Sequence, residues 1–258
     1  MARKDDPLGR TAARMLADYD AGTPGLIFAD GFRLNLPDAW RLQSMVTELR
    51  EARGEKVIGY KVGAVDPGNQ KLMGLQHPVW GRLWASELHE TGVALNKNDY
   101  ANISIEAEFA ITLSRELKPG LSIDALADSV ATVCPVLELH NQVMRGEPPH
   151  GHELIANNCI NCGVVRGPPV TNLSQSRQTD LKMVYDGQTV DEWEALWWPD
   201  DILAAVDWLA QSLGEHGLRL KAGDLILTSA WGPPIPVADC TRVDVTSSAF
   251  GSVFATFT

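Results

Sequence analysis

The segment that most constrains the fold is residues 102–114, with the sequence NISIEAEFAITLS. Every second residue from Ile103 to Leu113 is apolar, and this alternation predicts a strand with one face in a core. The other face carries Glu106 and Glu108, whose Cβ atoms would lie about 7 Å apart. Two ionised carboxylates drawn to one point repel, so a cation must offset them or one must stay protonated. On the pair alone, two solvent-exposed glutamates are an equally good interpretation.

A second apolar strand is predicted at residues 132–140, TVCPVLELH, where Val136, Glu138 and His140 share a face. An ionised glutamate is seldom buried without a partner, so Glu138 is the natural third ligand of a metal site. Three carboxylates without histidine or cysteine favour Mg²⁺ or Mn²⁺. They also leave positions open for water and for a chelating substrate such as a 2-oxo acid, whose carbonyl the metal would polarise.

Lys61 lies in another predicted strand, residues 56–62, within the sequence GYKVG. Glycines on either side allow another backbone or a ligand to approach closely. A lysine in an apolar strand either extends its ammonium group to the surface or serves a site, and the sequence leaves both interpretations open. In a site, Lys61 would add positive charge or relay a proton.

Other chemically reactive side chains carry weaker signals. Cys159 and Cys162 form a single C-x-x-C pair without a second pair at zinc spacing, so reduced core thiols are expected. His150 and His152 lie in a loop with prolines and glycine, where a histidine is more often a surface residue than a ligand.

The order of predicted elements is helical first and strand-rich afterwards, which indicates an α+β protein. We expect a helical N-terminal region at 1–55 and a catalytic mixed-β domain at 56–258, forming one continuous body. The clearest later helix is expected at 199–214. The last predicted strands are 224–228, 241–246 and 252–257.

The formal net charge of −11 over 258 residues disfavours nonspecific binding to nucleic acid or to anionic membranes. No apolar run approaches the roughly 18 residues that a membrane span needs. The N-terminal segment lacks the hydrophobic core of a signal peptide. A cytoplasmic protein that binds no membrane and no nucleic acid is therefore expected.

Five motifs occur along the chain in an order that resembles a known family. They are GYKVG at 59–63, LQHPVWG at 75–81, E-x-E at 106–108, PVLE ending at Glu138, and GDLILT at 223–228 followed by FGSVFATF. In this order and spacing they resemble the 2-oxopent-4-enoate hydratase and 4-oxalocrotonate decarboxylase family, within the fumarylacetoacetate hydrolase superfamily. The resemblance runs from about residue 8 to the C-terminal residue.

This resemblance implies a mixed-sheet β-roll or barrel-like fold with a small helical N-terminal region. It implies Mg²⁺ or Mn²⁺ held by Glu106, Glu108 and Glu138, and a catalytic role for Lys61. The implied substrate is a 2-oxo acid or its dienol from the degradation of aromatic compounds, and the implied assembly is a homo-oligomer. Further substrate contacts are expected from His77, Trp80, Asn158 and Thr228.

The chain also departs from the family pattern. Val79 stands where the family usually has an aspartate that assists proton transfer. His140-Asn141-Gln142-Val143 replaces the family's Val-Asp-Ser-Arg, and Asn157-Asn158 replaces its Asp-Asn pair. The metal ligands are thus kept while the surrounding acid/base and charged positions are neutral, which puts the usual hydratase substrate in question.

Four functions remain open from the sequence. The first is a hydratase that adds water to a 2-hydroxydienoate, and the second is a decarboxylase of a 4-oxalocrotonate-like diacid. A C–C bond hydrolase is less favoured, because His77 and His140 are the only candidates for its water-activating pair. A non-catalytic homologue is the fourth, and a cavity filled by Val79, Trp80 and Trp84 would support it.

Overall fold

The computed structural model describes residues 7–173 and 175–258. Its α-helices are α1 (Pro7–Asp20), α2 (Leu26–Ala29), α3 (Leu36–Ala52), α4 (Pro67–Met73), α5 (Ile123–Ala127), α6 (Gly151–Ala156) and α7 (Val206–Glu215). Short 3₁₀ turns are η1 (Ala85–Glu87), η2 (Lys97–Asp99) and η3 (Asn158–Ile160). The strands are β1 (Val57–Gly63), β2 (Val79–Trp84), β3 (Leu88–Glu90), β4 (Val93–Leu95), β5 (Ile103–Leu113), β6 (Val130–Asn141), β7 (Asn161–Arg166), β8 (Arg177–Tyr185), β9 (Gln188–Trp198), β10 (Leu225–Leu227), β11 (Ile235–Pro236), β12 (Arg242–Ser247) and β13 (Gly251–Phe257).

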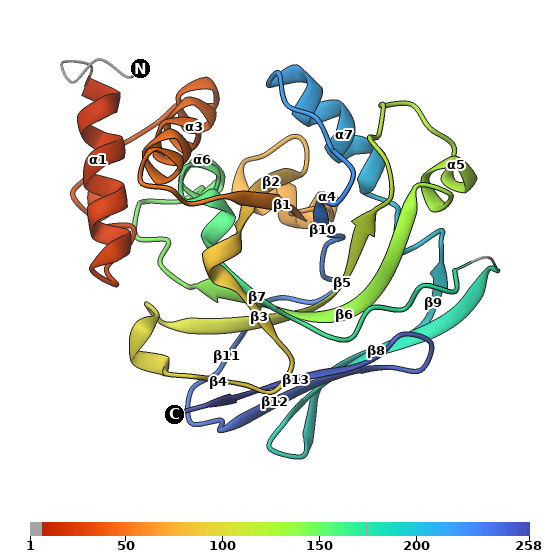
Figure 1. Ribbon diagram of the computed structural model, residues 1–258. Coiled ribbons are helices and arrows are strands. Elements are labelled where there is room, and N and C mark those ends of the chain that lie inside the picture. Colours follow the sequence, from red (N-terminus) through yellow and green to blue (C-terminus); the bar gives the residue numbers. More distant parts are fainter. Residues whose placement is uncertain (1–6, 174) are drawn as a thin grey trace.

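Two mixed sheets and a layer of helices build the molecule. The eight-stranded sheet has the order β2-β1-β10-β5-β6-β7-β3, with β11 also paired to β5, and the five-stranded sheet has the order β4-β13-β12-β8-β9. In Figure 1 the helices α1, α3, α6 and α7 lie on one side of the strongly curved β5–β6 ladder, and the five-stranded sheet lies on its other side. The expected α+β fold with a curled mixed sheet is therefore confirmed.

The long antiparallel pair of β5 and β6 forms the centre of the eight-stranded sheet. Its odd-numbered residues face the five-stranded sheet, where Phe109 packs edge-to-face on Phe250 with ring centroids 5.5 Å apart. On the other face a smaller apolar cluster includes Ala110 and Val136. Glu106, Glu108 and Glu138 continue that second face, as the alternation in the sequence predicts.

Gly59 allows β1 to lie against β10. Its φ is +156°, and a Cβ built on it would be 1.8 Å from the carbonyl oxygen of Leu225. Only glycine fits so close to another backbone. The parallel pairing that follows places Lys61 beside Leu227 and so fixes where the lysine enters the sheet.

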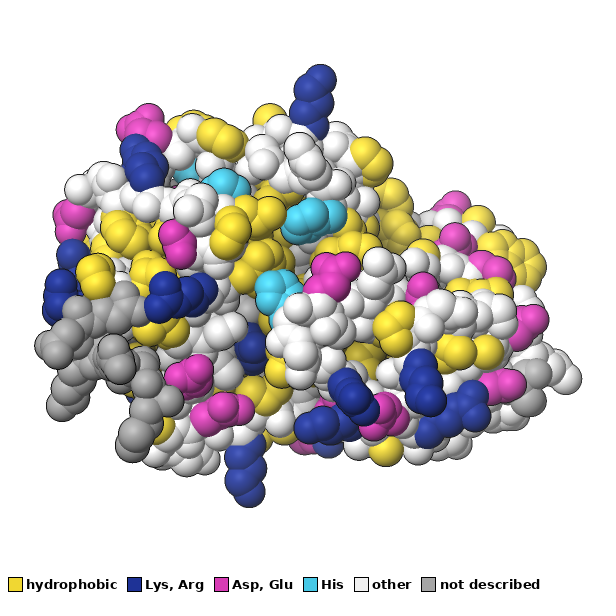
Figure 2. Space-filling model, turned by 90° about the horizontal axis from the view of Figure 1, so that it is seen from above, with side chains coloured by type: hydrophobic (Ala, Val, Ile, Leu, Met, Phe, Trp, Pro, Cys, Tyr) yellow, Lys and Arg dark blue, Asp and Glu magenta, His cyan; other side chains and the backbone are white. Residues whose placement is uncertain are grey.

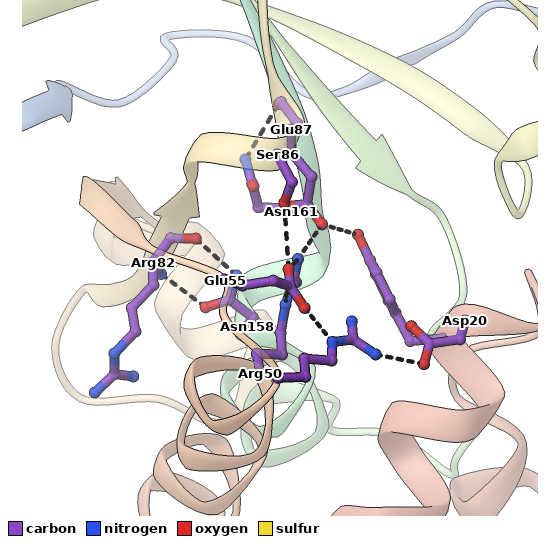
Figure 3. Close-up of polar contacts among 11 residues, drawn as sticks. Asp20, Arg50, Glu55, Arg82, Ser86, Glu87, Asn158 and Asn161 are labelled. Atoms are coloured by element: carbon purple, nitrogen blue, oxygen red, sulfur yellow. Dashed lines mark hydrogen bonds and ion pairs between the residues drawn. The ribbon is translucent and has the colours of Figure 1, made fainter.

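Buried charges fasten the N-terminal helices to the sheet. The guanidinium of Arg50 on α3 lies 2.5 Å from a carboxylate oxygen of Glu55 and 2.5 Å from one of Glu87, and Figure 3 shows these contacts. Arg50 also lies over the ring of Trp84, 4.1 Å from its centroid. Tyr19 of α1 donates a hydrogen bond to the same Glu87 oxygen. One carboxylate thus joins α1, α3 and the turn before β3.

The helix expected at 199–214 is shorter in the structure. Helix α7 begins at Val206, and the preceding residues form turns. The Asp201 carboxylate accepts a hydrogen bond from the backbone N–H of Trp197 at 2.8 Å. A local side-chain bond of this kind offers the backbone an alternative to helix and explains the later start.

The division at residue 55 stays a prediction. Helix α3 ends at Ala52 and β1 begins at Val57, so the change of secondary structure lies where it was expected. Ala156 of α6 nevertheless packs with α1 and α3 in one apolar cluster. None of the helices in the part of the chain that the structure describes has the length and apolar character needed to cross a bilayer.

Candidate active site

A cleft of about 690 Å³ opens beside the polar end of β5 and β6. Its lining includes Lys61, Glu106 and His140, together with the loop that contains Trp231. A volume of this size is in the range of small-molecule sites. Figure 2 looks down on the helix side of the molecule, where the surface is hollowed and hydrophobic side chains gather beside histidines.

Glu106, Glu138 and His140 meet at the cleft. Glu106 and Glu138 are paired across the ladder, and the ligand atoms of all three residues lie within 4.8 Å of one another. Nε2 of His140 is 3.0 Å from Oε1 of Glu138 and 3.7 Å from Oε2 of Glu106. Burial raises the pKa of Glu106, although its contacts with His140 and Lys61 oppose that effect.

Glu108 lies deeper on the same face and is fully buried. Its Oε2 accepts a hydrogen bond from the backbone N–H of Ser229 at 3.1 Å. Its Oε1 has no hydrogen-bond partner among the described residues. Burial, and then the neighbouring charge of Glu138, raise the pKa of Glu108 well above its ordinary value. Glu108 therefore favours its protonated form in the metal-free protein, and a bound cation would displace that proton.

Lys61 supplies positive charge to these carboxylates. Its Nζ lies 3.2 Å from Oε1 of Glu138, and the residue is only 3% exposed. Burial alone would lower the pKa of Lys61, but attraction to Glu138 and Glu106 outweighs it and raises the pKa. Of the two interpretations of this lysine, the structure excludes an ammonium group extended to bulk solvent.

Asn161 at the start of β7 was not foreseen from the sequence. Its side-chain amide donates a hydrogen bond of 2.8 Å to Oε1 of Glu138. Burial would raise the pKa of Glu138, but the contacts with His140, Lys61 and Asn161 lower it to about 2. Glu138 is therefore the carboxylate held ionised. Nothing in the local pattern around Asn161 signals this role, because it depends on β6 and β7 pairing.

Several buried polar atoms around this point have no hydrogen-bond partner among the described residues. They are Oε1 of Glu108, Oε2 of Glu138, and both ring nitrogens of His140. Buried polar atoms are nearly always satisfied, and carboxylate oxygens left unpaired beside an imidazole are the donor set that a bound cation would satisfy. Carboxylate oxygens and one imidazole suit a divalent metal ion. The residues present therefore fit the metal that the sequence resemblance implies.

Backbone strain gathers around the same cleft. The lining residues with φ in the left-handed region, none of them glycine, are Ala64 (φ 52°), Asn102 (60°), Cys159 (53°), Ile160 (56°) and Ser229 (86°). This conformation is rare for residues with a side chain and a genuine outlier for a β-branched one. Such strain concentrates at functional sites because the surrounding structure must hold it.

His77 and Trp80, expected at the substrate, do not line the cleft. The ring of His77 packs on Trp208 with centroids 6.3 Å apart. Trp80 is fully buried, stacks on Trp40, and donates its indole N–H to Ser212 at 3.1 Å.

The side chains of Asn158 and Thr228 hydrogen-bond to backbone groups and do not line the cleft. The Asn158 amide accepts from the N–H of Arg82 and donates to its carbonyl, as Figure 3 shows. Thr228 donates its hydroxyl to the carbonyl of Phe109. Chain neighbours line the cleft in their place, namely Val79, Cys159 and Ser229. Val79 and Trp80 are adjacent in strand β2 and so point to opposite sides, whereas Asn158, Cys159 and Ser229 have left-handed backbone that a strand pattern does not describe.

The filled cavity expected of a non-catalytic homologue is not found. Val79 lines the open cleft, whereas Trp80 and Trp84 pack away from it. His140 lies on the same face of β6 as Glu138, as the i, i+2 spacing in the sequence predicts.

Sequence comparison finds relatives that are enzymes, although no family model matches the chain. The 2-keto-4-pentenoate hydratase of Burkholderia vietnamiensis is 29% identical over 223 residues, which are 85% of each chain. The TodF product hydratase of Pseudomonas putida F1 is 28% identical over 255 residues, or 95% of each chain. Other relatives are named 2-hydroxyhexa-2,4-dienoate hydratase and 4-oxalocrotonate decarboxylase.

Structure comparison gives the same fold. The 4-oxalocrotonate decarboxylase from Pseudomonas putida G7, complexed with magnesium and adipate, superposes with a TM-score of 0.85 at 22% identity, covering 100% of this chain and 99% of that one. Fumarylpyruvate hydrolase from Pseudomonas aeruginosa, complexed with Mn²⁺ and pyruvate, has a TM-score of 0.59 at 15% identity and covers 77% of this chain and 88% of its own. The chain is thus a homologue of the 2-keto-4-pentenoate hydratases and 4-oxalocrotonate decarboxylases, and it has the fold of the fumarylacetoacetate hydrolase family.

Proposed function

We propose that this protein is a divalent-metal-dependent lyase that acts on a 2-oxo acid or its dienol, most simply as a hydratase of a 2-hydroxyalka-2,4-dienoate. The observation that carries the proposal is the group of unpaired buried carboxylate oxygens of Glu108 and Glu138 beside an open cleft. The hydratase and decarboxylase relatives support the same reaction class.

Glu106, Glu108 and Glu138 would hold Mg²⁺ or Mn²⁺. The bound ion would supply Lewis-acid stabilisation of negative charge that develops on a substrate oxygen. Asn161 keeps Glu138 oriented through its amide hydrogen bond. The N–H of Ser229 does the same for Glu108. These two bonds fix the carboxylates before substrate arrives.

Lys61 both lines the cleft and contacts Glu138, so its ammonium group can reach a substrate oxygen next to the carboxylates. Its raised pKa keeps it protonated. In that state it binds the substrate carboxylate or holds a proton for the dienol. Val79, which is paired with Gly63 on the strand beside β1, has no ionisable group and cannot supply a proton.

The lining of the cleft favours hydration over decarboxylation. Among the described residues that line it, Lys61 is the only lysine or arginine. Most of the remaining wall is apolar and includes Val65, Met73, Val79, Met144, Leu154 and Trp231. A 4-oxalocrotonate-like diacid would bring a second carboxylate into a cleft that offers it no second lysine or arginine, only neutral polar residues such as Asn69, Asn102 and Gln142. A dienoate with an uncharged tail fits the wall.

Turnover of 2-hydroxypenta-2,4-dienoate with Mg²⁺, followed as loss of dienol absorbance without CO₂ release, tests the proposal. Glu106→Gln should abolish metal binding and turnover together. The exposed Glu48→Gln on α3 is the matched control and should keep both. Full turnover in the presence of a chelator would contradict the metal dependence. Loss of absorbance with stoichiometric CO₂ would identify the decarboxylase alternative.

We also infer a cytoplasmic homo-oligomer. The resemblance to the family motivates the assembly, and two exposed apolar side chains on the edge strand β9, Trp197 and Val190, offer surface for contact with a second copy. Sedimentation of the purified protein tests it, and a monomer at micromolar concentration would contradict it.

A further inference from the structure

His140 is a buried imidazole, 2% exposed, that contacts the site carboxylates through one ring nitrogen only. Its Nε2 lies 3.0 Å from Oε1 of Glu138, whereas its Nδ1 has no hydrogen-bond partner among the described residues. Leaving a buried polar group unpaired costs about 1–3 kcal/mol. The ring nevertheless lies at the cleft, with Nε2 next to both Glu106 and Glu138. The three side chains therefore present ligand atoms within 4.8 Å of one another, a spacing at which one cation can bind all of them.

We propose that His140 is a nitrogen ligand of the divalent metal, so that the site takes a transition metal such as Mn²⁺, Fe²⁺ or Co²⁺ in preference to Mg²⁺. This inference rests on the proposed metal-dependent function and goes beyond the three carboxylates expected there.

The separations of the donor atoms fit coordination. Metal–ligand bonds of about 2.1 Å at right angles place neighbouring donors about 3.0 Å apart. Nε2 of His140 lies 3.0 Å from Oε1 of Glu138 and 3.7 Å from Oε2 of Glu106. Little movement is needed to bring these donors around one ion.

Strand register explains why the histidine is in place. Glu138 faces Glu106 across the β5–β6 ladder, and two residues on, His140 faces Ser104. Residues at this spacing project from the same face. Metal-bound histidines usually donate their other ring N–H to a neighbour. The Ser104 hydroxyl is fully buried, has no partner among the described residues, and is the group opposite the ring.

The nitrogen donor decides which metal is preferred. Mg²⁺ takes oxygen ligands almost entirely. Imidazole binds Fe²⁺ and Co²⁺ better than Mn²⁺, and it binds all three of these ions better than Mg²⁺. Lys61 is an ion-pair partner of Glu138, with its Nζ 3.2 Å from Oε1. A ligand set that contains both oxygen and nitrogen atoms therefore predicts that the site prefers Mn²⁺, Fe²⁺ or Co²⁺ to Mg²⁺.

Pulsed electron paramagnetic resonance of the full-length protein loaded with Mn²⁺ tests the ligand directly. We expect nitrogen modulation from an imidazole, and we expect it to change frequency when the protein is prepared with ¹⁵N-histidine. This labelling leaves the fold unaltered and distinguishes histidine from lysine nitrogen. Mn²⁺ binding without a ¹⁵N-histidine effect would overturn the proposal.

Competition between metals gives an independent readout. In the wild type, Co²⁺ and Mn²⁺ should bind at least about tenfold more tightly than Mg²⁺. His140→Leu should reduce that preference at least about tenfold, chiefly by weakening Co²⁺ and Mn²⁺. His77→Leu, a histidine outside the cleft, should leave the preference unchanged. Equal preference in wild type and His140→Leu would overturn the proposal.

These results separate the two proposals. One outcome is hydratase turnover with Mg²⁺ and no histidine nitrogen near bound Mn²⁺. It would support the proposed function and refute His140 as a metal ligand. Histidine coordination without dienoate turnover by any of the tested metals would retain the ligand and refute the hydratase.

Discussion

Glu106 and Glu138 lie directly opposite each other on neighbouring antiparallel strands. Carboxylates in this position repel, and cross-strand like charges destabilise a sheet. Glu106 is partly exposed at the cleft, whereas Glu138 is fully buried and paired with Lys61. The chain therefore keeps a local repulsion at the point where a divalent cation would bind.

Glu106→Gln is expected to stabilise the metal-free protein while it removes the metal response. Relief of the repulsion is worth about 0.2–1 kcal/mol, or roughly 0.4–4 °C in Tm for a protein of this size. Calorimetry with and without Mn²⁺ measures both effects. A variant that melts at a lower temperature than metal-free wild type would contradict the repulsion.

Metal affinity should fall as the pH falls. Burial raises the pKa of both Glu106 and Glu108, so the metal-free protein retains protons that a metal must displace. Raising the pH above those pKa values removes the competing protons and strengthens binding. Titration calorimetry in two buffers of different ionisation enthalpy should show proton release. A metal affinity independent of pH, with no proton release, would exclude protonated ligands.

Lys61→Met should destabilise the metal-free protein by about 3–5 kcal/mol, because it leaves buried carboxylates without their cation. Saturating Mn²⁺ should recover part of that loss. Urea unfolding with and without Mn²⁺ measures the loss of stability and its recovery. Lys71→Met, on the exposed face of α4, should change the free energy of unfolding by less than about 0.5 kcal/mol. Equal losses in the free energy of unfolding of Lys61→Met and Lys71→Met would contradict the electrostatic role of Lys61.

Gly59→Ala should cost at least about 3 kcal/mol and reduce turnover, since the new Cβ would collide with the Leu225 carbonyl and displace Lys61. Gly214→Ala in α7 is the control. No atom lies within 4 Å of its new Cβ, so about 0.5 kcal/mol of stabilisation is expected. Denaturant unfolding measures the stability of Gly59→Ala and Gly214→Ala, and steady-state kinetics measures their turnover. Normal stability of Gly59→Ala would refute the close approach.

Arg50→Met should weaken the attachment of the N-terminal helices by about 3–5 kcal/mol, because Glu87 would remain buried without its partner. Arg53→Met removes an exposed pair with Asp20 and should cost less than about 1 kcal/mol. Hydrogen exchange in α1 should rise in the first variant alone. Similar exchange in both would mean that the apolar contacts of α1 suffice.

Periodicity predicted the elements better than their arrangement. The alternation in 102–114 corresponds to β5, and the helical region expected at 1–55 contains α1, α2 and α3. The insertion of β10 between β1 and β5 had no local signal, because strand order depends on contacts between distant segments. Composition likewise could not show that Arg50 is buried.

The site residues likewise divide into those that the sequence predicted and those that only the pairing of strands brings together. The sequence predicted roles for Lys61, Glu106, Glu108 and Glu138, whose charges are unusual in apolar strands, and those roles stay a prediction. It did not reveal Asn161, whose hydrogen bond to Glu138 exists only after β7 pairs with β6. It also placed Trp80 at the substrate although the adjacent Val79 lines the cleft, because strand faces cannot be assigned across a loop.

The left-handed backbone around the cleft bears on how this protein can be engineered. Each non-glycine residue in that conformation costs about 1 kcal/mol or more, and Ala64, Ile160 and Ser229 are among them. Selection for heat resistance alone would relax these positions first, for example by accepting glycine. The same changes would loosen the walls of the cleft, so laboratory evolution toward thermostability should select against catalytic rate at these residues.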